Sequence, residues 1–130
     1  MTAQKIINRA LRLCRVLDAG EAAAAGDSAD ALDTLNAMLA EWHFAEVGLP
    51  DYSLSSLTEP LASDAADMEA IAYMLAIRIA PEYGVDLPMS AITIASDAMG
   101  RLRLRYFQPG LSDSSELPGR RRLVSYTGNY

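Results

Sequence analysis

The sequence predicts an all-α protein, a small bundle of about four helices with a long loop or short hairpin and an extended C-terminal arm. The first observation is the stretch from Ala70 to Pro81, which holds a single charge, Arg78, and has apolar residues at helical spacing. A helix that is apolar nearly all round is buried on most sides, and this one is too short to span a membrane. The second observation is that three further segments show amphipathic helical spacing. The third is the single cysteine, Cys14, which means that the fold rests on packing and not on an internal disulfide.

Charge is unevenly distributed along the chain of 130 residues, whose net charge is −6. Between Asp18 and Asp97 there are fifteen acidic residues and one basic residue, whereas the two ends hold ten basic and two acidic residues. An acidic middle with basic ends suits head-to-tail contacts between identical subunits, or an acidic partner for the ends. The alternative is that these charges are only solvated helix faces. The length suffices for one domain with a core, and because no signal peptide is evident we expect a soluble protein made in a reducing cytoplasm.

The first helix is predicted from Thr2 to Leu17. Thr2 is a good N-cap, because a hydroxyl can accept a hydrogen bond from an unpaired backbone N–H at a helix start. Three basic residues, Lys5, Arg9 and Arg12, follow one face of this helix. An apolar stripe follows another face and consists of Ile6, Ala10, Leu13 and Leu17.

The second helix is predicted from Ser28 to about Glu46, after a connector over residues 18–27. Asp27 or Ser28 would cap it, and Gly48 and Pro50 would end it. Its core stripe would be Leu32, Leu35, Leu39 and Trp42, with Met38 beside it. Two short-looped amphipathic helices, one basic and one acidic, are expected to form an antiparallel pair.

A long segment without helical character runs from Val47 to Ser63. Pro50 and Pro60 exclude a regular helix, and the alternation of Tyr52 and Leu54 with serines allows a short strand or hairpin. Connections in compact domains are usually about 4–6 residues long, so a segment of this length invites a functional interpretation. Two interpretations stay open, a loop laid over the bundle with its leucines in the core and an exposed binding loop.

Two helices are predicted after this loop. The central helix would be capped by Ser63, broken at Pro81 and stopped at Gly84. The last helix would run from Met89 to about Phe107. Its apolar seam would consist of Ile92, Ala95, Met99, Leu102 and Tyr106. Residues 101–105 also alternate as a strand does, which leaves the end of this helix ambiguous.

The composition changes at residue 108. Residues 108–130 are rich in glycine, proline and serine and cannot bury enough apolar surface to fold alone. They nevertheless carry three successive arginines followed by apolar and aromatic residues, the types that dominate binding hot spots. We therefore expect a helical domain over 1–107 and an arm over 108–130 that becomes ordered on a partner, the alternative being a frayed tail.

Catalytic and metal-binding signals are weak. There is no glycine-rich phosphate loop, and one cysteine with one histidine, His43, cannot supply an ordinary zinc site even if Glu46 joins them. A cell-wall hydrolase acting through carboxylates would need an acid in an apolar pocket, and Glu82 is the best candidate. A helix-terminal Glu82 paired with a base such as Arg78 is the simpler interpretation. We expect no cofactor and no metal.

A DNA-binding module is a third possibility. It would use Arg101, Arg103 and Arg105 and would bind duplex DNA with a steep salt dependence. The isoelectric point of about 4.6 disfavours it.

Several stretches resemble a known family. They are Ile6–Leu13, Ala29–Leu39 with Trp42, and Ala72–Gly84, which ends in Pro81-Glu82-Tyr83-Gly84. In this order they are similar to the head-to-tail adaptor proteins of tailed phages, the tail accessory factors of P22-like short-tailed phages. The resemblance covers about residues 3–105.

The resemblance implies a structural virion protein of the head–tail neck, with no catalytic residues. It implies a helical subunit in a twelve-fold homo-oligomeric ring beneath the portal protein, with a C-terminal arm on the portal. The ring would extend the DNA channel, retain packaged DNA without sequence-specific binding and dock a downstream tail or nozzle protein, with no membrane involved.

Two sets of residues are candidates for these contacts. The portal-binding arm would use Arg120, Arg121, Arg122, Leu123, Val124, Tyr126 and Tyr130. The subunit interface would use Arg9, Arg12, Arg101 and Arg105.

Overall fold

The computed structural model describes residues 1–18, 20–61 and 64–106. Its helices in chain order are α1 (Ala3–Leu13), α2 (Ala25–Glu41), the π-helix η1 (Trp42–Glu46), α3 (Ala65–Ile79), the 3-10 helix η2 (Ala80–Tyr83) and α4 (Met89–Tyr106). The all-α prediction is confirmed, because these residues form no β-strand and only one isolated bridge, between Thr2 and Pro60. The arm predicted over 108–130, with all seven of its candidate portal-binding residues, lies outside the described residues.

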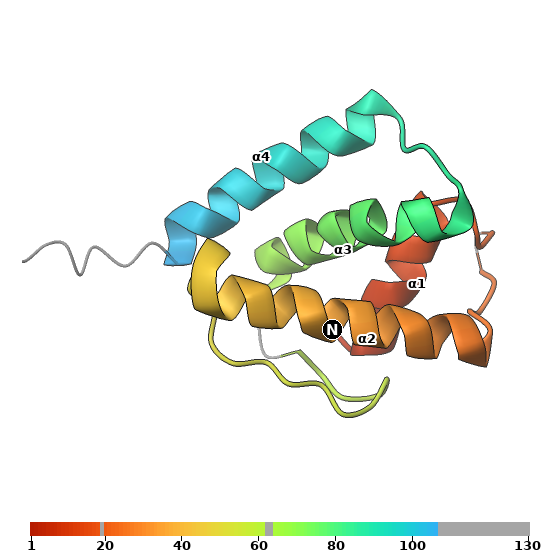
Figure 1. The fold of residues 1–130 in the computed structure, drawn as a ribbon, viewed down its shortest axis with the longest axis horizontal. Helices are drawn as coiled ribbons and strands as arrows, with labels where there is room; N and C mark the ends of the chain where they lie inside the picture. Colours follow the sequence, from red (N-terminus) through yellow and green to blue (C-terminus); the bar gives the residue numbers. More distant parts are fainter. Residues whose placement is uncertain (19, 62–63, 107–130) are drawn as a thin grey trace, which may run out of the picture.

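Helix α3 lies at the centre of the bundle and packs against α1, α2 and α4 (Figure 1). Its buried residues cover most of its circumference and include Ala70, Ile71, Ala72, Leu75, Ala76 and Ile79. The predicted end is confirmed, because the α-helix gives way to η2 before Pro81 and Gly84 caps it in the left-handed region at φ 63°. The predicted cap is wrong, because Asp64 and not Ser63 holds the N-cap position, and Ser63 lies outside the described residues.

Helix α1 begins as predicted, with the Thr2 hydroxyl accepting from the backbone N–H of Lys5 at 3.4 Å. It ends at Leu13, four residues before the predicted end. Arg15 adopts a left-handed φ of 59°, and the N–H groups of Arg15 and Val16 donate to carbonyls of the last helical turn. This pattern is a Schellman stop, which usually has glycine at the left-handed position, and the arginine there hides it from sequence inspection.

Helix α2 begins at Ala25, earlier than predicted, and its N-cap is Ala24 without any side-chain bond. The predicted capping by Asp27 or Ser28 is therefore wrong. Ser28 is instead buried against α1, where its hydroxyl accepts from Nε2 of Gln4 at 3.3 Å. The predicted core stripe is confirmed at Leu35, Met38, Leu39 and Trp42, which are buried, while Leu32 is half-buried.

The segment after η1 is a loop laid over the bundle, described here over residues 47–61 (Figure 1). Leu49, Leu54 and Leu61 are buried in the core, so the first of the two interpretations is confirmed. Of the two forms that the sequence allowed, a loop or a short hairpin, the described residues form the loop. The carbonyls of Leu57 and Glu59 accept from backbone N–H groups in the first turn of α1. The loop thereby satisfies donors that a helix start leaves unpaired.

Helix α4 is confirmed as a helix through residues 101–105, where the alternation also allowed a strand. Ala95, Ala98, Met99 and Leu102 are buried. Figure 1 shows that α4 lies close to α3 near its C-terminal end and diverges from it toward its N-terminal end. This divergence leaves Ile92, which we expected in the apolar seam, 40% exposed.

Candidate functional site

The last turn of α4 is fixed to the first turn of α3 by a hydrogen-bonded cluster. Arg105 donates to Asp67 at 2.6 Å and to Asp64, and the Tyr106 hydroxyl donates to the second oxygen of Asp67 at 2.8 Å. The hydrogen bond to Asp64, followed by the charges of both carboxylates, raises the pKa of Arg105. We call this cluster of four residues the α4 anchor. It fixes the C-terminal end of α4 against the start of α3.

A basic face follows α1. Arg9 donates from Nη2 to both carboxylate oxygens of Glu69 at 3.0 Å and lies 5.8 Å from the ring centre of Tyr73. Lys5 and Arg12 are exposed beside it. Together with Met1 and Asn8, the three basic residues line a shallow hollow of about 340 Å³. A polar, positively charged surface of this kind suits an acidic protein partner.

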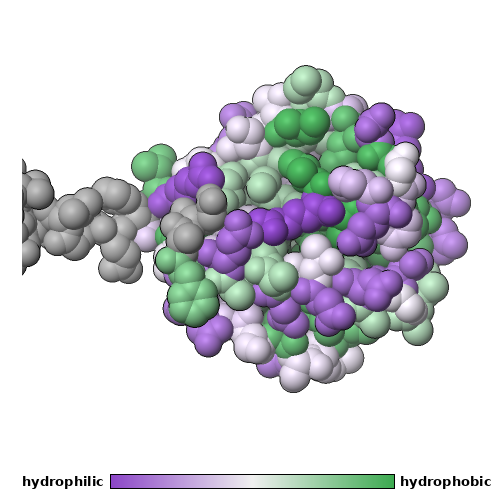
Figure 2. Space-filling model, in the orientation of Figure 1, coloured by the Kyte–Doolittle hydropathy of each residue, from purple (hydrophilic) through white to green (hydrophobic). Residues whose placement is uncertain are grey.

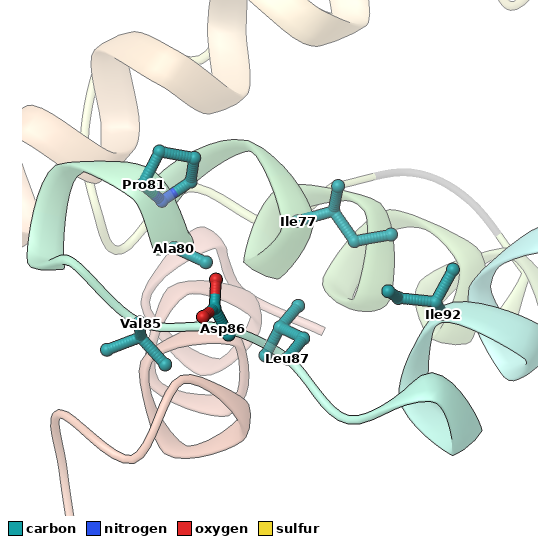
Figure 3. Close-up of a pocket in the computed structure, with 7 residues that line it drawn as sticks. All are labelled: Ile77, Ala80, Pro81, Val85, Asp86, Leu87 and Ile92. Atoms are coloured by element: carbon teal, nitrogen blue, oxygen red, sulfur yellow. The ribbon is translucent and has the colours of Figure 1, made fainter.

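An apolar groove lies between α3 and α4, where the two helices diverge. It consists of two adjoining hollows of about 190 and 260 Å³ that share Ile77 and Ile92. Figure 3 shows Ile77, Leu87 and Ile92 around the first of them, with the carboxylate of Asp86 directed toward Ala80 among the lining side chains. The remaining lining residues are Ala80, Pro81 and Val85 in the first hollow and Met74, Ser96, Met99 and Arg103 in the second. We call this feature the α3/α4 groove. In Figure 2 strongly apolar side chains gather on the face where α4 runs above α3.

The candidate catalytic acid is not placed for acid–base chemistry. Glu82 is exposed on η2, whereas a catalytic carboxyl needs an apolar environment to raise its pKa. The expected pairing of Glu82 with Arg78 is also wrong, because Arg78 donates to Glu41 on α2 at 2.6 Å. His43 is half-buried and its Nδ1 donates to the carbonyl of Leu49 at 2.6 Å. In the described part of the chain no three metal-ligating side chains come together.

The four arginines predicted for a subunit interface divide into two pairs. Arg9 and Arg105 are held by carboxylates of α3 within the same chain, so they brace the bundle. Arg12 and Arg101 are exposed, and no ion pair within the described ranges engages them. These two remain candidates for contacts with other molecules. A DNA-binding surface at residues 101–105 is disfavoured, because two carboxylates already neutralise Arg105.

Comparison with known proteins decides the family. A model of the family described as P22 tail accessory factor matches residues 1–119, which cover the whole bundle. The chain belongs to the P22 tail accessory factor family. No curated protein matches the chain.

Membership gives this P22 tail accessory factor a structural role in a phage tail and makes it a component of the virion. The family is structural, which agrees with the expectation of a protein without catalytic function. Among the described residues, none of the helices of this tail accessory factor is long and apolar enough to cross a membrane.

Two features of the chain are not among those predicted from its sequence. Asp67, in the first turn of α3, is a buried acceptor for groups 38 and 39 positions later in the chain. Ile92, expected in the apolar seam of the last helix, lines the groove together with Ile77. The sequence contains a signal for the bonds to Asp67, because Arg105 and Tyr106, two hydrogen-bond donors, are adjacent at the end of an amphipathic helix. No local signal exists for the groove, because it depends on the angle between two helices.

Proposed function

We propose that this tail accessory factor is the head-to-tail adaptor of the phage neck. Twelve copies would form a ring beneath the portal protein, extend its DNA channel, retain the packaged DNA and dock a downstream tail or nozzle protein. The observation that carries the proposal is the family match, which continues from the bundle into the C-terminal segment as far as residue 119. The protein would be made in the host cytoplasm and act in the virion.

The bundle has the properties of a rigid ring subunit. Ion pairs and hydrogen bonds connect α3 to α1, α2 and α4, through Arg9, Arg78 and Arg105 respectively. A subunit braced in this way can transmit load from the portal to the tail without changing shape. Arg12 and Arg101, which are exposed, are the arginines that we assign to contacts between subunits.

The C-terminal segment is the part that we assign to the portal. Its first residues follow Tyr106, which the α4 anchor holds against α3. A binding segment whose starting point is fixed loses less conformational entropy on binding, which favours a tighter complex. The arm would use Arg120, Arg121, Arg122, Leu123, Val124, Tyr126 and Tyr130, with the arginines steering encounter and the apolar residues anchoring the complex.

The charge of the chain suits a channel through which DNA slides. Duplex DNA is bound mainly by lysine and arginine side chains that neutralise phosphates. The acidic middle of this chain, with one basic residue among fifteen acidic ones between Asp18 and Asp97, offers few such side chains. If this acidic part of the chain formed the lumen of the ring, the lumen would surround the DNA but bind its phosphates only weakly.

Native mass spectrometry of the purified protein, with and without isolated portal rings, tests the proposal. We expect a complex with twelve copies of the chain that forms on the portal. Absence of any complex between the protein and portal rings, under all conditions, would refute the adaptor function. A chain truncated after Pro109 tests the arm separately, and unchanged affinity for portal rings would refute the assignment of the arm to the portal.

A further inference from the structure

Two large apolar side chains are exposed at one end of the bundle. Phe44 on η1 is 84% exposed and Leu104 near the end of α4 is 77% exposed. The chain just after η1 lies near the last residue of α4, because a Cβ placed on Gly48 would lie 3.7 Å from the carbonyl oxygen of Tyr106 (Figure 1). We call Phe44 and Leu104 the apolar end. Exposed side chains of this size mark an interaction site when they have a complementary surface to enter.

A complementary surface lies along α4. The first hollow of the α3/α4 groove lies beside Ile92 in the N-terminal half of α4, and the second hollow continues along the helix as far as Arg103. Because an α-helix of 18 residues is about 27 Å long, the first hollow is well separated from Leu104. Each of the groove's two hollows is smaller than the roughly 300–1,000 Å³ of a usual small-molecule site. Ile77 and Ile92 make it apolar, so its size and lining suit a protruding apolar side chain of a protein.

The charges near the apolar end and near the first hollow of the groove are of opposite sign. Arg101 is exposed and lies three residues before Leu104, so the two side chains share one face of α4. Asp86 lines the first hollow of the α3/α4 groove. An arginine beside the protruding side chain and a carboxylate beside the groove would attract each other across a contact.

From this pairing we infer that the apolar end of one copy docks into the α3/α4 groove of the next copy. The inference rests on the proposed ring and names the surfaces that close it. The part of the groove that we assign to this contact is its first hollow, which lies beside Ile92 and is remote from Leu104. Each copy therefore offers two different surfaces, and the contact is heterologous. Contacts of this kind produce a ring when the rotation between copies closes and an open filament when it does not.

Disulfide cross-linking on portal rings tests the inference. The double variant Phe44→Cys/Ile92→Cys is assembled on portal, oxidised and separated without reductant. We expect a ladder of covalent oligomers, because each copy would be joined to both neighbours. Phe44→Cys/Ile94→Cys is the matched control, since Ile94 is also 40% exposed on α4 but does not line the groove. The native Cys14 is buried and does not take part.

Charge reversal provides a second test that keeps the apolar surfaces intact. Arg101→Asp and Asp86→Arg should each lower the yield of the ring complex at least about tenfold, because each places like charges opposite one another. The double reversal should restore it. Arg15→Asp is a control for reversal of an exposed basic side chain to which no contact is assigned.

The outcomes separate this inference from the proposed function. Complete rings of Phe44→Cys/Ile92→Cys that give no covalent ladder would overturn the inference and leave the adaptor function intact. Ladders of equal intensity for this variant and for Phe44→Cys/Ile94→Cys would do the same. If portal protects the Ile92→Cys thiol from a thiol reagent and no ladder forms, the groove contacts the portal instead of a neighbouring copy. That result would also overturn the inference. A wild-type chain that never joins the portal would refute the adaptor function itself, and the inference with it.

Discussion

Asn36 on α2 is the side chain that fastens the loop over residues 47–61 to the bundle. Its amide nitrogen donates to the carbonyl of Leu54 at 2.8 Å, and its amide oxygen accepts from the N–H of Leu54 at 3.0 Å. The side chain therefore pairs with a loop residue as a neighbouring β-strand would. Leu54 itself is buried, so the polar groups of its backbone have no easy access to water.

Replacement of Asn36 by alanine should cost about 2–6 kcal/mol of unfolding free energy. It leaves the N–H and the C=O of Leu54 without a partner, and each unsatisfied buried polar group costs about 1–3 kcal/mol. The sum is a large share of the roughly 5–15 kcal/mol that stabilises a typical domain.

Urea unfolding followed by circular dichroism measures this loss, and hydrogen exchange at the Leu54 amide shows its origin. The matched control is Thr34→Ala on the same helix, which removes an exposed hydroxyl that bonds to the carbonyl of Asp30 at 3.1 Å and should leave stability almost unchanged. In Asn36→Asp the acceptor for the Leu54 N–H is kept while a carboxylate faces the Leu54 carbonyl, so an intermediate loss is expected. Equal midpoints for Asn36→Ala and Thr34→Ala, with unchanged exchange at Leu54, would show that the buried leucines hold the loop by themselves.

Three further predictions concern the bundle. Asp67→Ala should lower the urea midpoint several times more than Asp64→Ala, because the Asp67 side chain is 1% exposed and the Asp64 side chain 74%, although both bind the same arginine; equal midpoints would contradict this. Arg15→Gly should stabilise the protein by up to about 1 kcal/mol, since glycine adopts the left-handed φ of 59° without steric cost, whereas Arg15→Ala should give no such gain. Burial raises the pKa of Cys14 from 9.0 to about 11, so the unfolded chain loses this proton first and stability should fall as the pH rises through that interval. Urea titrations between those pH values should show a smaller fall for Cys14→Ala, and an identical fall would refute the contribution of the thiol.

The central helix illustrates what could be predicted. Its nearly uniform apolar character, its break at Pro81 and its stop at Gly84 are local properties of the chain, and all three are confirmed. An apolar surface can only be buried, a proline cannot donate within a helix and glycine adopts a positive φ freely. No knowledge of the neighbouring helices was needed.

The boundaries that were predicted wrongly depend on contacts distant in sequence. Ser28 has the chemistry of an N-cap, but α1 recruits its hydroxyl through Gln4, and α2 begins earlier with an alanine at its cap. Helix α1 stops at a left-handed arginine, where sequence patterns would place glycine. In both cases tertiary packing outweighs a local preference, which is worth only about 1 kcal/mol.

The sequence by itself determined the helical architecture, the position of the buried helix, the basic face of α1 and the family resemblance. Only the tertiary structure decided which charges are free for partners. Arg9 and Arg105 are held within the chain by carboxylates at least 38 residues away, while Arg12 and Arg101 stay exposed. It also decided that Ile92 lines a groove and is not sealed in the core. The physical reason is that helical periodicity fixes which face of a helix is apolar, whereas the angle between two packed helices fixes how much of that face is covered.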